Sequence, residues 1–159
     1  MELQTQRLTV ILQTREELEQ LIKGMSEYDR AQISSDWLAR MRTSKEGDPW
    51  MHAFRVVQRG TGVAIGTCSF KGPPVDGIVE IAYGIDPEYE GKGYATELAR
   101  ALVELASSCS EVHLIRAHTL PNAIASKRVL RKCGFEFVGE TFDAEDGMVA
   151  RFERTAGVN

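Results

Sequence analysis

The sequence has no apolar run close to the roughly 18 residues that a membrane-spanning helix needs. Its first residues contain no apolar segment of the kind found in a secretory signal peptide. Basic residues are not in excess, because 19 Lys and Arg stand against 23 Asp and Glu, for a formal charge of −4 at pH 7. A chain of this charge has no general electrostatic attraction to nucleic acid or anionic lipid. We therefore expect no membrane and no nucleic acid among its partners.

Cysteine is also scarce, with Cys68, Cys109 and Cys133 separated by 41 and 24 residues. An odd number of cysteines does not form a disulfide framework, and these spacings match no zinc motif. We expect no bound metal, and the reduced cytoplasm is the expected location. Packing in the core is the expected role of Cys133, which follows a short helix and precedes Gly134.

The composition is that of a folded globular protein. Hydrophobic residues make up 43% and charged residues 26% of the 159 residues. No internal repeat, low-complexity tract or linker interrupts the chain. We therefore expect one domain, spanning residues 1–159, around a single hydrophobic core.

The order of the expected elements indicates a mixed α/β fold. Short apolar runs and alternating patterns predict strands at residues 3–12, 53–59, 63–70, 78–85, 112–119, 135–138 and 148–154. Helical spacing predicts helices at residues 15–25, 35–42, 94–107 and 125–132, the first after a Thr14–Glu17 capping box. A strand, a helix and a second strand between residues 78 and 119 form a crossover, which requires parallel strands. We expect a central mixed, mostly antiparallel sheet flanked by about four helices.

A glycine-rich turn is the most informative local feature, with Gly91 and Gly93 between the strand at 78–85 and the helix at 94–107. The first N–H groups of a helix have no internal partner and lie at the positive end of its dipole, so a phosphate or pyrophosphate fits there. A glycine-rich connection that binds nothing is the alternative. The third glycine of a dinucleotide fingerprint is missing after Gly93, and no glycine lies five positions before Gly91, as a Walker A loop requires.

A family resemblance narrows the choice of phosphate ligand. Residues 79–96, which read VEIAYGIDPEYEGKGYAT, resemble the acetyl-CoA-binding motif of the GNAT acyltransferase superfamily. Residues 117–121 (AHTLP) and 125–135 (ASKRVLRKCGF) resemble the second motif of its RimJ/RimL-type branch, and residues 3–8 (LQTQRL) resemble that branch's first strand. The resemblance runs from about residue 2 to residue 155. It implies the GNAT fold, acetyl-CoA as the acyl donor, and direct transfer of the acetyl group to a primary amine.

The resemblance also implies which residues contact the cofactor. They are Tyr83, Gly84, Ile85, Glu90, Gly91, Lys92, Gly93, Tyr94, Ala95, Thr96, Asn122 and Ser126. Two positions depart from the family pattern, since Glu90 replaces the usual Gln or Arg and Asn122 lies four residues before Ser126 rather than two or three. Either Asn122 reaches the cofactor through a longer loop or that contact is absent. The basic residues between 127 and 132 are expected to form a solvated face, with a contact to the 3′-phosphate of the cofactor as the alternative.

The catalytic candidates implied by the resemblance are Glu80 and Ser126. Glu80 resembles the strand glutamate that many members use as a base, and the alternative is a structural or substrate-binding role. The tyrosine that many members use as the acid is replaced by Leu130, and in this branch Ser126 corresponds to a serine near the sulfur. A local role in the first helical turn is the alternative for Ser126. His118 lies near the end of its strand and could face the crevice, but His113 lies on the opposite face, so a paired catalytic or metal role is not expected.

The free energy needed to deprotonate the amine indicates which class of acceptor is easier to acetylate. An α-amine with a pKa near ~7.8 is roughly a tenth neutral at pH 7, whereas a lysine near ~10.4 is neutral to about one part in 2,500. Deprotonating lysine therefore costs on the order of 3–3.5 kcal/mol more. We expect the acceptor to be a protein or peptide N-terminal α-amine, or a small-molecule amine of low pKa. The alternative functions are a non-catalytic acyl-CoA-binding or regulatory module and an interaction domain without a ligand, and a homodimer is an open alternative to a monomer.

Overall fold

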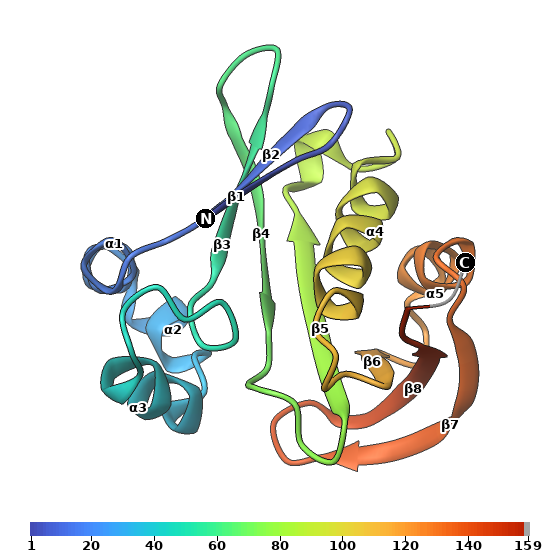
Figure 1. Cartoon of the computed structure of the whole chain (residues 1–159). Helices are drawn as coiled ribbons and strands as arrows, with labels where there is room; N and C mark the ends of the chain where they lie inside the picture. Colours follow the sequence, from blue (N-terminus) through green and yellow to red (C-terminus); the bar gives the residue numbers. More distant parts are fainter. Residues whose placement is uncertain (158–159) are drawn as a thin grey trace.

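The computed structural model describes residues 1–157 and shows an eight-stranded sheet with helices on its faces (Figure 1). The strands are β1 (Glu2–Gln4), β2 (Leu8–Leu12), β3 (Phe54–Gln58), β4 (Ala64–Phe70), β5 (Ile78–Ile85), β6 (Leu114–Thr119), β7 (Glu136–Asp143) and β8 (Gly147–Thr155). The helices are α1 (Arg15–Lys23), α2 (Glu27–Ala31), α3 (Ser35–Thr43), α4 (Tyr94–Ser107) and α5 (Ile124–Lys132), and a 3₁₀ turn, η1, spans Pro87–Tyr89. Within the described residues, no helix is long and apolar enough to cross a bilayer.

The strands follow the order β1-β2-β3-β4-β5-β6-β8-β7, and every neighbouring pair is antiparallel except β5 and β6. The parallel pair confirms the expected crossover through α4. Its ladder contains only three residue pairs, the last of which joins Glu80 to Arg116. Beyond that pair, β5 stays with β4 as far as Ile85 and β6 stays with β8 as far as Thr119. The two halves of the sheet therefore diverge from Glu80 onward.

The main core lies where α4 packs on the sheet. Leu98 and Leu102 of α4 are fully buried, and they share one cluster with Phe54, Ile115 and Phe152 from three different strands. α4 is apolar on this face because its leucines and alanines recur at helical spacing, as the sequence predicts. The bounds of β5 and α4 agree with the predicted bounds at both ends. These two elements carry the glycine turn between them.

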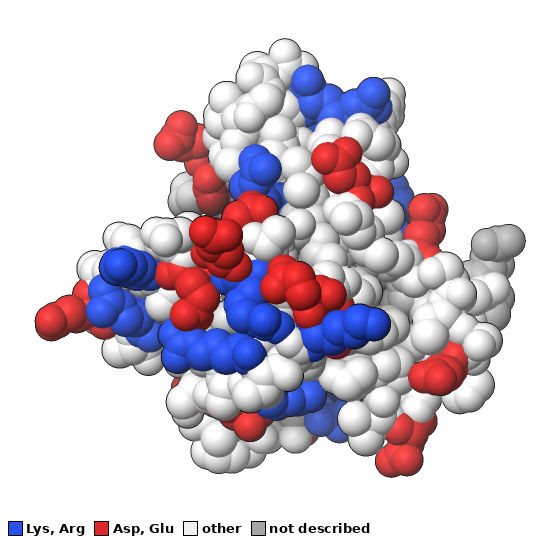
Figure 2. Space-filling model, turned by 60° about the vertical axis from the view of Figure 1, so that its left-hand side comes forward, with Lys and Arg blue, Asp and Glu red and all other residues white. Residues whose placement is uncertain are grey.

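A smaller apolar cluster holds the helices of the N-terminal third, which Figure 1 shows grouped together away from α4. It consists of the buried side chains Leu18, Ile22 and Met41 from α1 and α3. On the face that carries these helices, basic and acidic side chains are interleaved (Figure 2), and ion pairs such as Arg42–Glu19 at 2.8 Å join them. Because exposed ion pairs contribute little, the apolar cluster supplies most of the stability of this unit.

The structure corrects several expected elements. The strand expected over residues 3–12 is two antiparallel strands, because a turn closed by a 2.9 Å hydrogen bond from the Thr5 N–H to the Leu8 carbonyl separates them. α2 is an unexpected helix, which makes five helices within residues 1–157 rather than about four. None of its residues is buried, so no apolar periodicity marks it. β7 extends to Asp143 instead of residue 138. β6 begins at Leu114, so His113 precedes the strand rather than belonging to it.

Gly66 gives a test of the tight pairing of β4 with β5. A Cβ atom at Gly66 would collide with the carbonyl oxygen of Gly84 and lie 3.2 Å from the Cα of Ile85. Since backbone atoms cannot move aside cheaply, Gly66→Ala should cost about 2–3 kcal/mol. We expect a fall in melting temperature of several degrees, at roughly 2–4 °C per kcal/mol for a domain of this size.

Gly60→Ala is the matched control, because no atom lies within 4 Å of the added Cβ there. Its melting temperature should stay close to that of the wild type. Equal melting temperatures for the two variants would contradict the described packing of β4 on β5.

Candidate active site

A cleft opens where β5 and β6 diverge. Its cavity has a volume of about 700 Å³. The free end of β5, the glycine turn, the start of α4 and one face of α5 line it. The lining residues are Tyr83, Gly84, Ile85, Tyr89, Glu90, Gly91, Gly93, Tyr94, Ala95, Thr96, Ala125, Ser126, Arg128, Val129 and Lys132. The structure thus brings all the sequence-predicted cofactor residues together in one cavity, except Lys92 and Asn122.

The glycine turn has the backbone shape that the sequence predicts for an anion site. Gly91 and Gly93 have φ angles of 75° and 85°, in the left-handed region that favours glycine. Gly93 is the N-cap of α4, and no side chain caps this helix. The first N–H groups of a helix of 14 residues are therefore left without a side-chain acceptor at the edge of the cavity. Such groups can bind a phosphate or pyrophosphate.

Lys92 and Asn122 lie outside the cavity lining. The carbonyl of Lys92 accepts a 2.9 Å hydrogen bond from Arg7, and its ammonium lies 5.9 Å from the ring centre of Tyr89. Asn122 is exposed in the turn between β6 and α5. The proposed contacts of both side chains with the cofactor stay predictions.

The charge of Glu90 is opposed by cations on the facing helix. Glu90 lines the cavity and makes no ion pair with Lys92 or any other described residue. Arg128 and Lys132 of α5 line the same cavity. An anionic ligand in the cleft would therefore meet two cations as well as one carboxylate.

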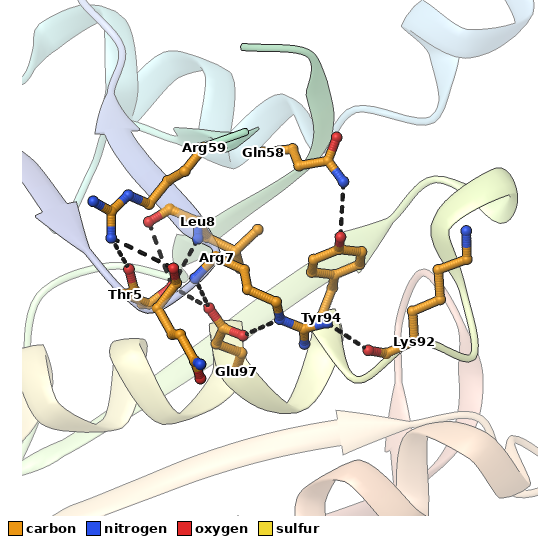
Figure 3. A network of polar contacts seen from close by, with 9 residues as sticks. Thr5, Arg7, Leu8, Gln58, Arg59, Lys92, Tyr94 and Glu97 are labelled. Atoms are coloured by element: carbon orange, nitrogen blue, oxygen red, sulfur yellow. Dashed lines mark hydrogen bonds and ion pairs between the residues drawn. The ribbon is translucent and has the colours of Figure 1, made fainter. Parts of the chain in front are cut away.

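A polar network fixes the turn from its outer side (Figure 3). Arg7 donates from Nε to Oε1 of Glu97 at 2.8 Å, and its backbone N–H donates to Oε2 at 2.8 Å. The Thr5 hydroxyl donates to the same carboxylate. The Arg7 guanidinium also donates to the Lys92 carbonyl and lies 4.2 Å from the ring centre of Tyr94. The turn between β1 and β2 is thereby tied to both the glycine turn and the first turn of α4.

Sequence reasoning missed this role of Arg7. The only signal was its place in the segment LQTQRL, which resembles the family's first strand. Its partner Glu97 lies 90 residues away, so the pair cannot be read from local spacing.

The network also determines the charge of Glu97. Burial alone would raise the pKa of its carboxyl, but the hydrogen bonds from Thr5 and Arg7 and the positive charge of Arg7 lower the pKa below its usual range. Glu97 therefore stays ionised and paired at neutral pH.

Glu80 lies at the vertex of the cleft, on the last pair of the parallel ladder. Its Oε2 atom is 2.9 Å from Nδ1 of His118 and 3.2 Å from Nζ of Lys71. These three residues line a second cavity of about 250 Å³, and Ser126 lines it as well. The two catalytic candidates thus face one space, and His118 faces it from β6.

Tyr83 links the two cavities, since it lines both. Its hydroxyl is buried and has no hydrogen-bond partner among the described residues. Burial, with a smaller contribution from the nearby Cys133, raises the pKa of this phenol well above its usual range. Tyr83 is thus a neutral O–H donor whose acceptor no described residue supplies.

The buried thiols have no acidic character. Burial raises the pKa of the Cys68 thiol to about 12, and burial also raises the pKa of Cys133. Neither is a thiolate at neutral pH, which argues against a cysteine nucleophile at these positions. The packing role predicted for Cys133 agrees with its place in the main core.

Sequence comparisons point to one family. A family model described as the acetyltransferase (GNAT) domain matches residues 5–136. The "uncharacterized N-acetyltransferase YnaD" of Bacillus subtilis is 34% identical over 86 residues, which are 54% of this chain and 51% of that protein. The match thus spans about half the length of this curated relative.

Solved structures share the fold. The ribosomal-protein-S5-alanine acetyltransferase of Vibrio fischeri matches with a TM-score of 0.73 and 16% identity, over 99% of this chain and 97% of that chain. The spermidine N-acetyltransferase of Vibrio cholerae, in complex with CoA and spermine, matches with a TM-score of 0.70 and 16% identity, over 96% and 97%. At these identities the likeness concerns the fold alone, and it confirms the fold class expected from the sequence.

The lowered pKa of Glu97 predicts how acid affects stability. In the unfolded chain a Glu carboxyl has a pKa of about 4.3, and in the folded protein the pKa of Glu97 is lower. The carboxylate therefore contributes its full stabilisation at a pH above the unfolded-state pKa. This stabilisation is lost as the pH falls through the folded-state pKa. Glu97→Gln should therefore be less stable than the wild type at pH 7, and the difference should shrink as the pH falls below about 4.3. Urea unfolding over this pH range measures it.

Glu104→Gln is the matched control, because Glu104 lies on the same helix and has no ion pair among residues 1–157. The same change with pH in both variants would contradict the role given to the Arg7–Glu97 network.

Proposed function

Because this chain belongs to the GNAT acetyltransferase family, we propose that it transfers an acetyl group from acetyl-CoA directly to a primary amine. The observation that carries the proposal is the cleft beyond Glu80, where an uncapped helix N-terminus and the free end of β5 line one cavity. The non-catalytic module is not favoured by the family match.

The cavity contains groups that can bind each part of acetyl-CoA. The N–H groups after Gly91 and Gly93 would bind the pyrophosphate. On its β6 side, the backbone of Tyr83 to Ile85 has no partner strand in the described part of the chain, so its polar groups can bind the pantetheine and the thioester carbonyl. Arg128 and Lys132 supply positive charge for the remaining phosphate. Glu90 would weaken binding, because it adds a negative charge to the lining of the same cavity.

The reaction needs a base, a polarised carbonyl and a donor to the leaving sulfur. In the proposed reaction the amine nitrogen attacks the thioester carbon, the C–N bond forms, and the C–S bond breaks. Glu80 takes the proton that the amine loses, directly or through one water. Ser126, which lines both cavities, donates a hydrogen bond to the departing thiolate. The thiolate then takes up one proton from solvent, which balances the proton that Glu80 later releases to solvent. The high pKa of the buried thiols of Cys68 and Cys133 supports a transfer without an acyl-enzyme.

For the acceptor we propose an N-terminal α-amine or a small amine of low pKa. A single carboxylate base deprotonates such an amine more readily than a lysine. The names of two structural neighbours, a ribosomal-protein-S5-alanine acetyltransferase and a spermidine N-acetyltransferase, show that the shared fold accommodates protein and small-molecule acceptors.

Release of CoA thiol with a panel of amines tests the acceptor class. The panel pairs a peptide with a free α-amine and no lysine against an N-acetylated peptide with one lysine, and adds a small amine whose pKa lies near that of an α-amine. We expect turnover with the α-amine peptide or a small amine to exceed turnover with the lysine peptide. Activity on lysine alone would overturn the acceptor class. CoA binding without turnover on any amine would favour the non-catalytic module.

The roles of Glu80 and Ser126 are tested by Glu80→Gln and Ser126→Ala. Each should lower kcat by about tenfold or more, because Glu80→Gln removes the acceptor of the amine proton and Ser126→Ala removes the hydrogen-bond donor to the leaving sulfur. Glu88→Gln is a suitable control, since Glu88 is exposed in η1 and lines neither cavity. Unchanged rates in both test variants would contradict the assigned roles and leave the family assignment intact.

A further inference from the structure

Glu80 belongs to a chain of polar contacts that crosses three strands. His118 of β6 contacts it from one side, through Nδ1 to Oε2 at 2.9 Å. On the other side of the imidazole, Nε of Arg151 donates to Nε2 of His118 at 3.0 Å. Arg151 lies on β8 and is the direct cross-strand partner of His118. The order of contacts is therefore Arg151, His118, Glu80.

The chemistry of the arginine determines where the histidine carries its proton. A guanidinium only donates hydrogen bonds and keeps its protons in proteins. Nε2 of His118 must therefore be the acceptor, and the ring proton lies on Nδ1. In this arrangement the Nδ1–H of His118 donates to Glu80. Protonation of Nε2 would break the bond from Arg151 and bring two cations together.

The two carboxylate oxygens of Glu80 differ in their contacts. His118 and Lys71 both contact Oε2, at 2.9 Å and 3.2 Å. No described residue hydrogen-bonds to Oε1. One oxygen is thus fixed by the protein, and the other is left for an amine proton or a water. The His118 side chain is only 15% exposed, whereas that of Lys71 is 48% exposed, so the histidine is the more rigid of the two donors.

We propose that His118 is a positioning residue that fixes the Glu80 carboxylate for catalysis, and that Arg151 selects the tautomer in which it does so. This inference rests on the proposed role of Glu80 as the base. Without the Nδ1–H donor, Glu80 is held by the flexible Lys71 alone and turns away from the reacting amine. Misplacement of a catalytic group by about 1 Å costs on the order of a hundredfold in rate.

A purely structural bridge between strands is the competing explanation, and the chain contains a suitable comparison. Arg116 and Glu153 bridge β6 and β8 two residues along, with Nη2 and Oε2 2.6 Å apart. Glu153 lines neither the cofactor cavity nor the cavity of Glu80. Glu153→Gln therefore removes a comparable strand-bridging charge without touching the base.

The kinetic test uses His118→Leu, His118→Asn and Glu153→Gln in the full chain, with the best amine acceptor. Leu removes the donor, whereas the amide of Asn can donate from nearly the position of Nδ1. We expect His118→Leu to lower kcat by roughly ten- to a hundredfold. His118→Asn should recover most of this loss. The KM for acetyl-CoA should stay unchanged in all three variants, because none of these residues lines the cofactor cavity.

The tautomer is tested separately by ¹⁵N-histidine NMR of the wild type and of Arg151→Met, with His118→Asn to assign the signal. We expect the proton on Nδ1 in the wild type, and a shift toward Nε2 protonation in Arg151→Met. A proton on Nε2 in the wild type would overturn the role of Arg151.

Three kinetic outcomes distinguish the positioning role of His118 from the proposed function. If the wild type turns over and His118→Leu keeps its kcat, the positioning role fails and the proposed function stands. If His118→Leu and Glu153→Gln lose kcat alike, in step with their urea midpoints, the bridge is only structural. If the wild type turns over no amine, the proposed function fails and the positioning role fails with it.

Discussion

The parallel pairing of β5 with β6 ends at Glu80 and Arg116, and the cleft forms because the two strands are free to diverge from there. Backbone N–H and C=O groups that lose a partner strand need another partner, and at the free end of β5 a ligand can supply it. The same divergence leaves room for one cavity that the glycine turn and α5 both line. It also leaves Glu80 at the vertex, where its carboxylate faces the space that Ser126 shares. In the proposed function, cofactor binding and base catalysis thus both depend on one interruption of the sheet.

Several polar groups around this cleft lack the partners that such groups usually have in folded proteins. α4 has no side-chain cap at its N-terminus, and the buried Tyr83 hydroxyl has no partner among the described residues. Glu90 places a carboxylate beside the proposed anion site. The uncapped helix and the buried Tyr83 hydroxyl lower the stability of the protein alone, and each leaves a donor for a bound ligand. The Arg7–Glu97 network opposes this cost by tying the turn to the β1–β2 hairpin from outside the cavity.

The sequence predicts the parts of this site that depend on local pattern. The bounds of β5 and α4 follow from dense apolar periodicity, and the positive φ of Gly93 follows from the short turn that joins them. Contacts between distant segments could not be predicted in the same way. The Glu80–His118 contact joins residues 38 apart and depends on the register of β5 against β6. α2 escaped prediction because it buries nothing. Whether Asn122 reaches the cofactor stays a prediction, because its spacing to Ser126 departs from the family motif.

Amide hydrogen exchange with and without CoA is the sharpest test of the proposed cofactor site, because backbone N–H groups form most of that site. We expect CoA to slow exchange at the free end of β5, residues 83–85, and at the turn and helix start, residues 91–96. NADH and ATP at the same concentration should protect these amides less than CoA does. Unchanged exchange in both segments when CoA is saturating, or protection confined to another part of the chain, would contradict the account.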